Sequence, residues 1–126
     1  MTKFTFSKAS ISKKKYGNKK IRLDGIVFDS RKEANRYAEL KLLQKCGKID
    51  GLELQKEFVL IPAQYIGEGK RRTCVERAVK YKADFYYRDA ATGQFVCEDT
   101  KGFKTKDYIL KRKMMLYFHG IRIIEI

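Results

Sequence analysis

Residues 80–88 show the clearest alternation of hydrophobic and polar positions in the chain. In an extended strand, successive side chains point to opposite faces of a sheet, so this segment predicts a strand with one buried and one polar face. The face expected to be buried carries Tyr81, Ala83, Phe85 and Tyr87. A turn over 89–93 leads into a second predicted strand at 94–101, and we expect these two strands to pair.

Three further signals for strands precede this pair. Lys20–Leu23 and Ile26–Phe28 flank the dipeptide Asp24-Gly25, which is typical of two-residue hairpin turns. Leu52–Ile61 predicts a further strand that ends at Pro62, because proline has no N–H to donate to a sheet.

Two segments have helical character. The first runs from Ser30 to Cys46, where Ser30 and Glu33 match a capping box and Gly47 is a natural stop. The second covers residues 105–118 and is also followed by a glycine. The first helix is therefore bounded at both ends by residues that favour helix termini, and Gly120 is expected to end the second.

The order of elements from residue 30 onward is helix, three strands, helix, strand, with a basic loop at 64–72 and a closing strand at 121–126. Three strands joined by turns, followed by a helix that crosses to a fourth strand, predict a mixed central sheet with helices packed on it. The expected fold class is α/β (α+β). Residues 1–19 lack periodicity and predict a basic flexible arm, whereas 20–126 predict a single domain.

The charge of the chain is strongly positive. Its 126 residues contain 29 Lys and Arg but only 15 Asp and Glu, a formal net charge of +14. Residues 1–23 contain no acid, and the basic group at 101–113 faces only Asp107. Phosphate is the usual partner of such an excess, since each neutralised phosphate releases condensed counterions. An anionic membrane surface is the alternative, but these lysines lack the apolar face of an interfacial helix. Nucleic acid is favoured.

Several classes of protein and site are excluded by composition. No apolar run approaches the roughly 20 residues of a membrane span, and the first residues do not resemble a signal peptide. Cys46, Cys74 and Cys97 are widely spaced, and His119 is the one histidine, so the usual four-ligand zinc site is excluded. Reduced thiols and the absence of a membrane segment predict a cytoplasmic protein.

Two acids and a lysine form the candidate catalytic group. Asp84 lies in the middle of one predicted strand, Asp99 lies near the end of the next, and Lys101 shares the predicted face of Asp99. Metal-dependent hydrolysis of a phosphodiester requires oxygen ligands for a hard cation and a group that stabilises charge on the phosphorane. Glu33, at the start of the first helix, offers a further carboxylate.

Each of these residues also has a simpler interpretation. Asp84 could offset the charge of neighbouring lysines, and Asp99 could be a turn residue at a strand end. Lys101 could bind phosphate without a catalytic role, and capping alone could explain Glu33. Glu98 competes with Asp99, but its side chain is expected on the face opposite Lys101. Gln55 could orient water or phosphate, or form only a hydrogen bond at a strand edge.

Asp84 together with Asp99-Thr100-Lys101 resembles the signature of the PD-(D/E)XK nuclease superfamily. The order of elements also resembles its restriction-endonuclease-like core, Glu33 resembles the acid of its leading helix, and the spacing and basic arm resemble its Holliday-junction-resolvase-like branch. Ala83, where the superfamily pattern has proline, departs from that pattern.

A second, closer resemblance covers about residues 13–126. Four motifs resemble a bacteriophage family known only as a domain of unknown function: Tyr16-Gly-Asn-Lys-Lys, Phe28-Asp-Ser-Arg-Lys-Glu-Ala, Leu54-Gln55 and Glu98-Asp-Thr-Lys-Gly-Phe. This resemblance implies work on phage DNA in recombination, replication or packaging, in the cytoplasm of a host bacterium.

Together the residues and the resemblances predict a magnesium-dependent DNA endonuclease that selects junctions or branched DNA. Asp84, Asp99, the Thr100 backbone carbonyl and Glu33 would hold Mg²⁺ or Mn²⁺, and Lys101 would orient water and stabilise charge. The alternatives are a nuclease-fold protein that binds nucleic acid without cutting it and a structural RNA-binding protein of ribosomal type.

The predicted DNA contacts are basic residues, which give affinity more than sequence preference. They are Lys13, Lys14, Lys15, Lys19, Lys20, Lys70, Arg71, Arg72, Lys104, Lys106, Lys111, Arg112 and Lys113. Because one site of this kind cuts one strand, we also expect a homodimer that presents two sites. The apolar segments at 121–126 and 26–28 are candidate edges for that pairing.

Overall fold

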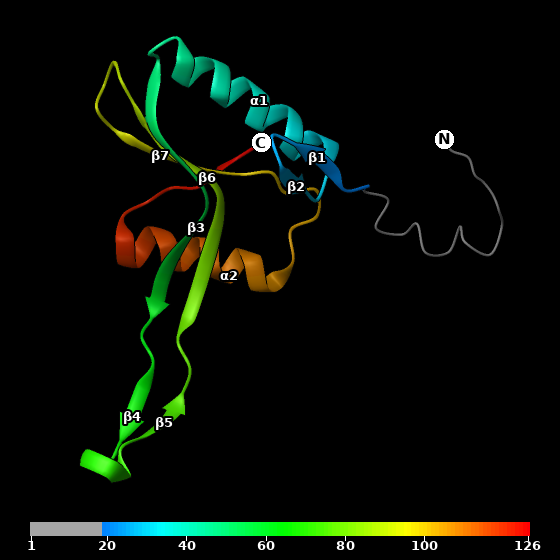
Figure 1. Ribbon diagram of the computed structural model, residues 1–126. Helices are drawn as coiled ribbons and strands as arrows, with labels where there is room; N and C mark the ends of the chain where they lie inside the picture. The colour runs from blue at the N-terminus through cyan, green and yellow to red at the C-terminus, as the bar shows by residue number, and fades with distance from the viewer. Residues whose placement is uncertain (1–18) are drawn as a thin grey trace, which may run out of the picture. The chain divides into compact units, whose positions relative to one another are not determined.

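The structure, a computed structural model, describes residues 19–126 (Figure 1). The predicted basic arm, apart from Lys19, therefore lies outside the described residues. The chain divides between Glu39 and Leu40 into two compact units. Among the described residues, no helix is long and apolar enough to span a membrane.

In the unit before Leu40, the predicted hairpin is the first element of the described residues. Strands β1 (Ile21–Leu23) and β2 (Ile26–Phe28) pair antiparallel. Asp24 and Gly25 both have positive φ angles, 54° and 77°, as the central residues of a two-residue hairpin turn of type I′ require. The Asp24-Gly25 prediction is confirmed.

Helix α1 (Arg31–Lys45) follows the hairpin and agrees with its predicted bounds. The backbone N–H of Glu33 donates to the Ser30 side chain over 3.1 Å, so Ser30 caps the helix. Gly47, with φ 78°, follows the last turn in the left-handed conformation that terminates helices. Local chemistry thus fixes both ends of α1.

The second unit contains a four-stranded mixed sheet in the order β3-β6-β7-β8. Strands β3 (Ile49–Ile61), β6 (Val79–Asp89) and β7 (Phe95–Asp99) pair antiparallel with their neighbours, and β8 (Ile124–Glu125) runs parallel to β7. The predicted α/β class with a mixed sheet is confirmed. The alternation along β6 is also confirmed, because its predicted apolar face is buried.

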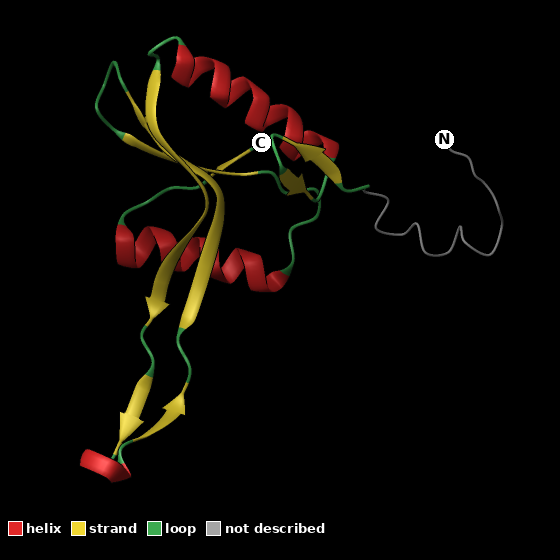
Figure 2. Ribbon diagram, in the orientation of Figure 1, coloured by secondary structure: helices red, strands yellow, loops and turns green. Residues whose placement is uncertain are grey.

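Strands β7 and β8 are shorter than predicted. β7 ends at Asp99 rather than at Lys101, and Figure 2 shows a loop from its end to the next helix. The physical reason is that the Thr100 N–H donates to the carboxylate of Asp84, not to a neighbouring strand. β8 covers two residues of the predicted closing strand at 121–126.

The predicted loop at 64–72 is wrong. Strand β4 (Gln64–Ile66), a 3₁₀ turn η2 (Gly69–Arg71) and strand β5 (Thr73–Glu76) form a hairpin instead. Neither strand buries a residue, so the sequence carries no burial pattern there to reveal them. In Figure 1 this hairpin continues the long ribbon made by β3 and β6.

Helix α2 (Lys106–Met114) packs on the sheet of the second unit. The Thr105 side chain caps it by accepting from the N–H of Tyr108, and the helix continues as a π-helical turn, η3 (Met115–His119). The predicted helix at 105–118 is confirmed, but its π-helical end was not foreseen. Its buried residues join a core that includes Leu60, Tyr81, Ala83, Cys97, Tyr108, Met115 and Ile123.

Candidate active site

Asp84 and Asp99 are brought together by the pairing of β6 with β7. Phe85 lies opposite Glu98 in this pair, so one step along the antiparallel ladder leads to Asp84 and Asp99. Asp84 Oδ2 accepts from the Thr100 backbone N–H over 2.9 Å and from the Thr100 hydroxyl over 2.7 Å. Thr100 therefore ties the carboxylate of one strand to the end of the other.

The Asp99 carboxyl group is almost completely buried, with 2% of the residue exposed. Its Oδ2 accepts from the Tyr81 hydroxyl, and its Oδ1 lies 3.8 Å from the Lys101 ammonium. Burial, assisted by the nearby charge of Asp84, raises the pKa of Asp99 to about 6, although Tyr81 and Lys101 act to lower it. The site thus holds an acid whose negative charge is only partly compensated.

This pair of carboxylates fits a hard divalent cation. Carboxylate oxygens are the ligands that Mg²⁺ prefers, and a cation beside Asp99 would favour its ionised form. Within residues 19–126, no group of three or more His, Cys, Asp or Glu side chains is arranged to hold a metal ion. A two-acid set nevertheless suits Mg²⁺, which commonly keeps waters and substrate phosphate as its other ligands. The predicted role of the Thr100 carbonyl stays a prediction.

Lys101 reaches the site from the loop after β7, not from the strand as predicted. Its ammonium lies near Asp99 and 4.9 Å from the centre of the Tyr108 ring, so a cation–π contact with α2 supports it. About a third of its side chain, 35%, is exposed, compared with 3% for Asp99. The lysine is therefore positioned beside the acids while still open to a ligand.

Glu98 and Asp99 have different partners, which separates their roles. Glu98 is buried and accepts from the Tyr87 hydroxyl. Asp99 is the acid that contacts Lys101 and lies next to Asp84. The prediction that Asp99, not Glu98, belongs with Lys101 is consistent with these contacts.

Gln55 contacts the site through an unusual backbone. Its φ angle is 54°, a left-handed conformation that is costly for a residue other than glycine. Its side-chain amide donates to Asp84 Oδ1 over 3.4 Å. The sequence suggested Gln55 only weakly, and no signal in it revealed the strained backbone.

Tyr81 is a supporting residue that the sequence assigned only to the core. Its hydroxyl donates to Asp99, and burial together with Asp99 raises its pKa, so the hydroxyl keeps its proton. A tyrosine on the buried face of a strand gives no sign of this partner, because the contact joins residues on different elements.

Glu33 lies in the first turn of α1, in the other compact unit. Its side chain is buried, with 7% of the residue exposed. The Ser30 half of the predicted capping box is confirmed, because the Glu33 backbone N–H donates to the Ser30 side chain; the contact of the Glu33 side chain with the Ser30 backbone stays a prediction. Its role as a metal ligand stays a prediction.

The predicted DNA-binding residues differ in their surroundings. Lys13, Lys14 and Lys15 lie outside the described residues. Three cations of the second unit form ion pairs: Lys104 and Arg112 with Glu125, at 3.7 and 2.9 Å, and Lys111 with Asp107, at 3.5 Å. Lys20 pairs with Asp29. Lys19, Lys106 and Lys113 are exposed, as are Lys70, Arg71 and Arg72.

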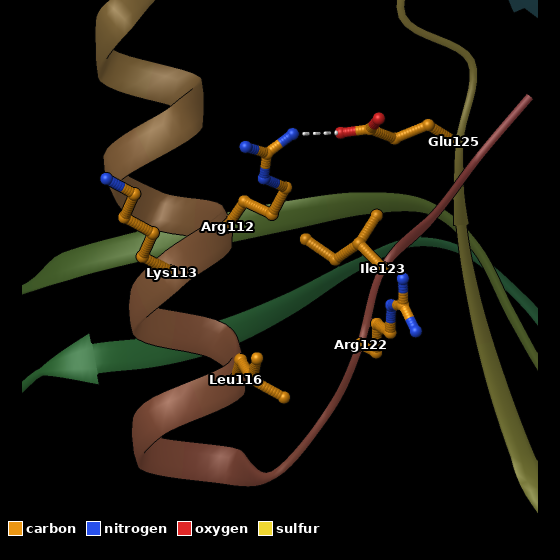
Figure 3. Close-up of a pocket in the computed structure, with 6 residues that line it drawn as sticks. All are labelled: Arg112, Lys113, Leu116, Arg122, Ile123 and Glu125. Atoms are coloured by element: carbon orange, nitrogen blue, oxygen red, sulfur yellow. Dashed lines mark hydrogen bonds and ion pairs between the residues drawn. The ribbon is translucent and has the colours of Figure 1, made fainter.

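A cavity of about 220 Å³ lies between α2 and the segment that leads into β8 (Figure 3). Figure 3 shows Arg112 reaching from the helix to Glu125 beside it. Hydrogen bonds from Tyr108 and Arg112 lower the pKa of Glu125. The residues that line the cavity are Arg112, Lys113, Leu116, Arg122, Ile123 and Glu125.

The chain belongs to the family described as "Protein of unknown function (DUF1064)", whose model matches residues 13–124. No curated protein and no solved structure matches it. Membership of the PD-(D/E)XK superfamily stays a prediction.

Proposed function

We propose that this member of the family is a metal-dependent DNA endonuclease that hydrolyses phosphodiester bonds with Asp84, Asp99 and Lys101. One observation carries the proposal: two carboxylates from adjacent strands converge where β7 ends, with a partly exposed lysine 3.8 Å from the buried acid. Acids for a hard cation and a cation for a phosphorane are what this hydrolysis requires.

Each residue of the site would have a distinct role in the proposed hydrolysis. Asp84 and Asp99 would hold Mg²⁺ or Mn²⁺, which supplies Lewis-acid polarisation of a phosphoryl oxygen when bound. Lys101 would orient water and offset the negative charge that develops on the phosphorane. Thr100 and Tyr81 keep the two carboxylates in place through the hydrogen bonds that they donate.

DNA is the proposed substrate because the chain carries a formal charge of +14. The resemblance to junction-resolving nucleases favours branched DNA, processed in the cytoplasm of a host bacterium. Glu33 would add a carboxylate if α1 brings it to the same ion.

One observation favours a second candidate, a protein on a nuclease fold that binds nucleic acid without cutting it. Every carboxylate oxygen of the pair already has a protein partner: Gln55 and Thr100 for Asp84, and Tyr81 and Lys101 for Asp99. Such a network could serve structure alone. Cleavage separates the two candidates.

The test is incubation of the protein with labelled duplex, single-stranded, flapped and four-way-junction DNA, each with Mg²⁺, Mn²⁺ or EDTA. We expect cleavage of at least one DNA in the presence of a divalent metal and none in EDTA. Binding without cleavage under every condition would favour the second candidate.

A further inference from the structure

The β4–β5 hairpin, residues 64–76, buries nothing. All residues of β4, η2 and β5 are exposed, including the large apolar side chains of Tyr65, Ile66 and Val75. In Figure 1 the hairpin extends past α2, to the far end of the ribbon that β3 and β6 begin. It therefore contributes no side chain to the core around Tyr81 and Met115.

An isolated two-stranded hairpin is at best marginally stable in water, because it lacks a third strand or a helix to cover its faces. This hairpin compensates in part through its own contacts. The Arg72 guanidinium lies 3.9 Å from the centre of the Tyr65 ring, and the Thr73 hydroxyl donates to the Arg71 carbonyl. Gly67, with φ 84°, permits the tight turn, where a Cβ would lie 2.5 Å from the Arg71 carbonyl oxygen. The turn is well defined although both faces are uncovered.

The cations of the hairpin have no acidic partner within residues 19–126, although Arg72 lies over the Tyr65 ring. Lys70 and Arg71 lie in the η2 turn and Arg72 follows it, yet none forms an ion pair with a described residue. By contrast, Lys104, Lys111 and Arg112 near α2 all have acidic partners. The tip therefore presents three adjacent positive charges to an outside partner.

We propose that the β4–β5 hairpin binds a groove of duplex DNA about one helical turn away from the bond that is cut. The major groove, about 12 Å wide, admits a two-stranded β-ribbon, and the tip cations would contact the phosphates along it. The location of the cut rests on the proposed function; binding of a duplex by the hairpin does not.

The distance follows from the length of the ribbon. Arg72 and Asp84 are joined by an almost continuous extended chain of about 12 residue steps, and at about 3.3 Å per residue these span up to roughly 40 Å. One turn of B-DNA is about 34–36 Å long. A duplex with its scissile phosphate at Asp84 and Asp99 thus has its next turn within reach of the tip.

Charge selects DNA over a second copy of this chain as the occupant. Another copy also carries +14, so its surface would repel the tip, whereas the phosphates of a duplex attract it. The exposed apolar residues beside the tip do not oppose DNA, since ribbons that enter grooves also contact thymine methyl groups and sugars.

The test compares the full-length protein with a triple variant, Lys70→Ala/Arg71→Ala/Arg72→Ala. The matched control is Lys32→Ala/Lys41→Ala/Lys45→Ala, which removes the same charge from exposed positions of α1, where alanine favours the helix. Binding to duplexes of about 10 and about 30 base pairs is measured in EDTA by fluorescence anisotropy, from about 50 to about 200 mM salt. Light scattering reports the oligomeric state of each variant.

On the long duplex, we expect the hairpin variant to bind at least about tenfold more weakly than wild type, with a slope of log K against log salt flatter by up to about 2.7. The short duplex is only about one helical turn long, so it has no base pairs to spare beyond the span from the site to the tip, and on it the hairpin variant should lose clearly less affinity than on the long duplex. The control should retain the wild-type dependence on length.

The proposal would be overturned if the hairpin and control variants lost equal affinity for DNA, or if the hairpin variant lost equal affinity for the short and the long duplex. A changed oligomeric state with unchanged DNA binding would also overturn it, because the hairpin would then contact a second copy. Because binding is measured in EDTA, this result does not depend on cleavage. If wild type cuts no DNA but the hairpin variant still loses affinity only for the long duplex, the proposed nuclease activity is refuted while the binding of DNA by the hairpin is retained.

Discussion

Asp99 is the residue on which the electrostatics of the site depend. It is buried beside another acid, and its pKa is raised to about 6, first by burial and then by Asp84. Tyr81 and Lys101 stabilise the ionised form of Asp99 through a hydrogen bond and an ion pair, and so offset part of this rise in pKa. A metal ligand must be deprotonated, and Asp99 loses its proton only near pH 6. Metal binding should therefore strengthen as the pH rises through this value.

The raised pKa predicts how metal-free protein responds to pH. The folded protein holds the Asp99 proton more tightly than the unfolded chain, so ionisation lowers the free energy of unfolding as the pH rises from about 4 to about 6. Asp99→Asn cannot ionise at this position. Relative to this variant, the free energy of unfolding of wild type should fall by up to about 3 kcal/mol by pH 7.5. Urea unfolding of both proteins in EDTA measures it, and a difference that does not change with pH would contradict the assignment.

Thr100 should act as a positioning residue. Thr100→Val keeps the backbone N–H that donates to Asp84 but removes the hydroxyl 2.7 Å from it. Because partners behind a metal ligand typically contribute about 10- to 100-fold to metal affinity or activity, the Mg²⁺ concentration for half-maximal cleavage should rise by that order. Thr92→Val, in the turn between β6 and β7, is the matched control. An unchanged metal requirement in Thr100→Val would rule out this role.

Among the helices and strands, the features that could be predicted from the sequence are those determined by residues close together in the chain. The Ser30 cap, the Asp24-Gly25 turn and the alternation of β6 each depend on neighbours in sequence, and each is confirmed. The sequence did not predict the β4–β5 hairpin, which buries nothing and so leaves no pattern. It also placed Lys101 on a strand, because the hydrogen bond of Thr100 with Asp84 that ends β7 joins residues distant in the chain.

The acids and the lysine of the candidate site could be predicted from the sequence, but the residues that hold the acids in place could not. Asp84, Asp99 and Lys101 could be selected because acids that lie opposite each other on one face of an antiparallel pair converge. Tyr81 and the strained Gln55 could not, since their contacts with the acids depend on packing and on a backbone conformation that glutamine rarely adopts.

The lysines of residues 1–19 give a further prediction at this scale. Deleting this segment removes Lys3, Lys8, Lys13, Lys14, Lys15 and Lys19 and none of the strands or helices of the structure. We expect weaker DNA binding and a salt slope flatter by about 0.9 for each phosphate that the shortened chain no longer neutralises. Filter binding across a salt series measures the slope, and an unchanged slope would show that these lysines do not touch DNA.

For the whole molecule, the proposed nuclease activity raises the matter of how both strands of a duplex or junction would be cut. One site of this kind cuts one strand, and a two-fold dimer is the commonest way to present two. Strand β8 lies at an edge of the four-stranded sheet, and Ile124 in it is 49% exposed. It therefore remains a candidate edge for pairing, although it is only two residues long.

We accordingly predict a homodimer, at least when DNA is bound. Light scattering of the free and DNA-bound protein should give twice the 14.8 kDa mass of one chain, after subtraction of the DNA. A monomer in both states that makes isolated nicks would remove the junction-resolving role and leave a nicking or flap-cutting enzyme.

The most direct test of the central claim is single-turnover cleavage by wild type, Asp84→Asn and Asp99→Asn of the DNA that wild type cuts best. Asp107→Asn, an exposed acid of α2, is the control with the same change of charge. We expect both site variants to lose about 1,000-fold or more in rate while binding DNA in EDTA at least as tightly as wild type, and the control to cut normally. Wild-type cleavage rates in either site variant would contradict a metal site at Asp84 and Asp99.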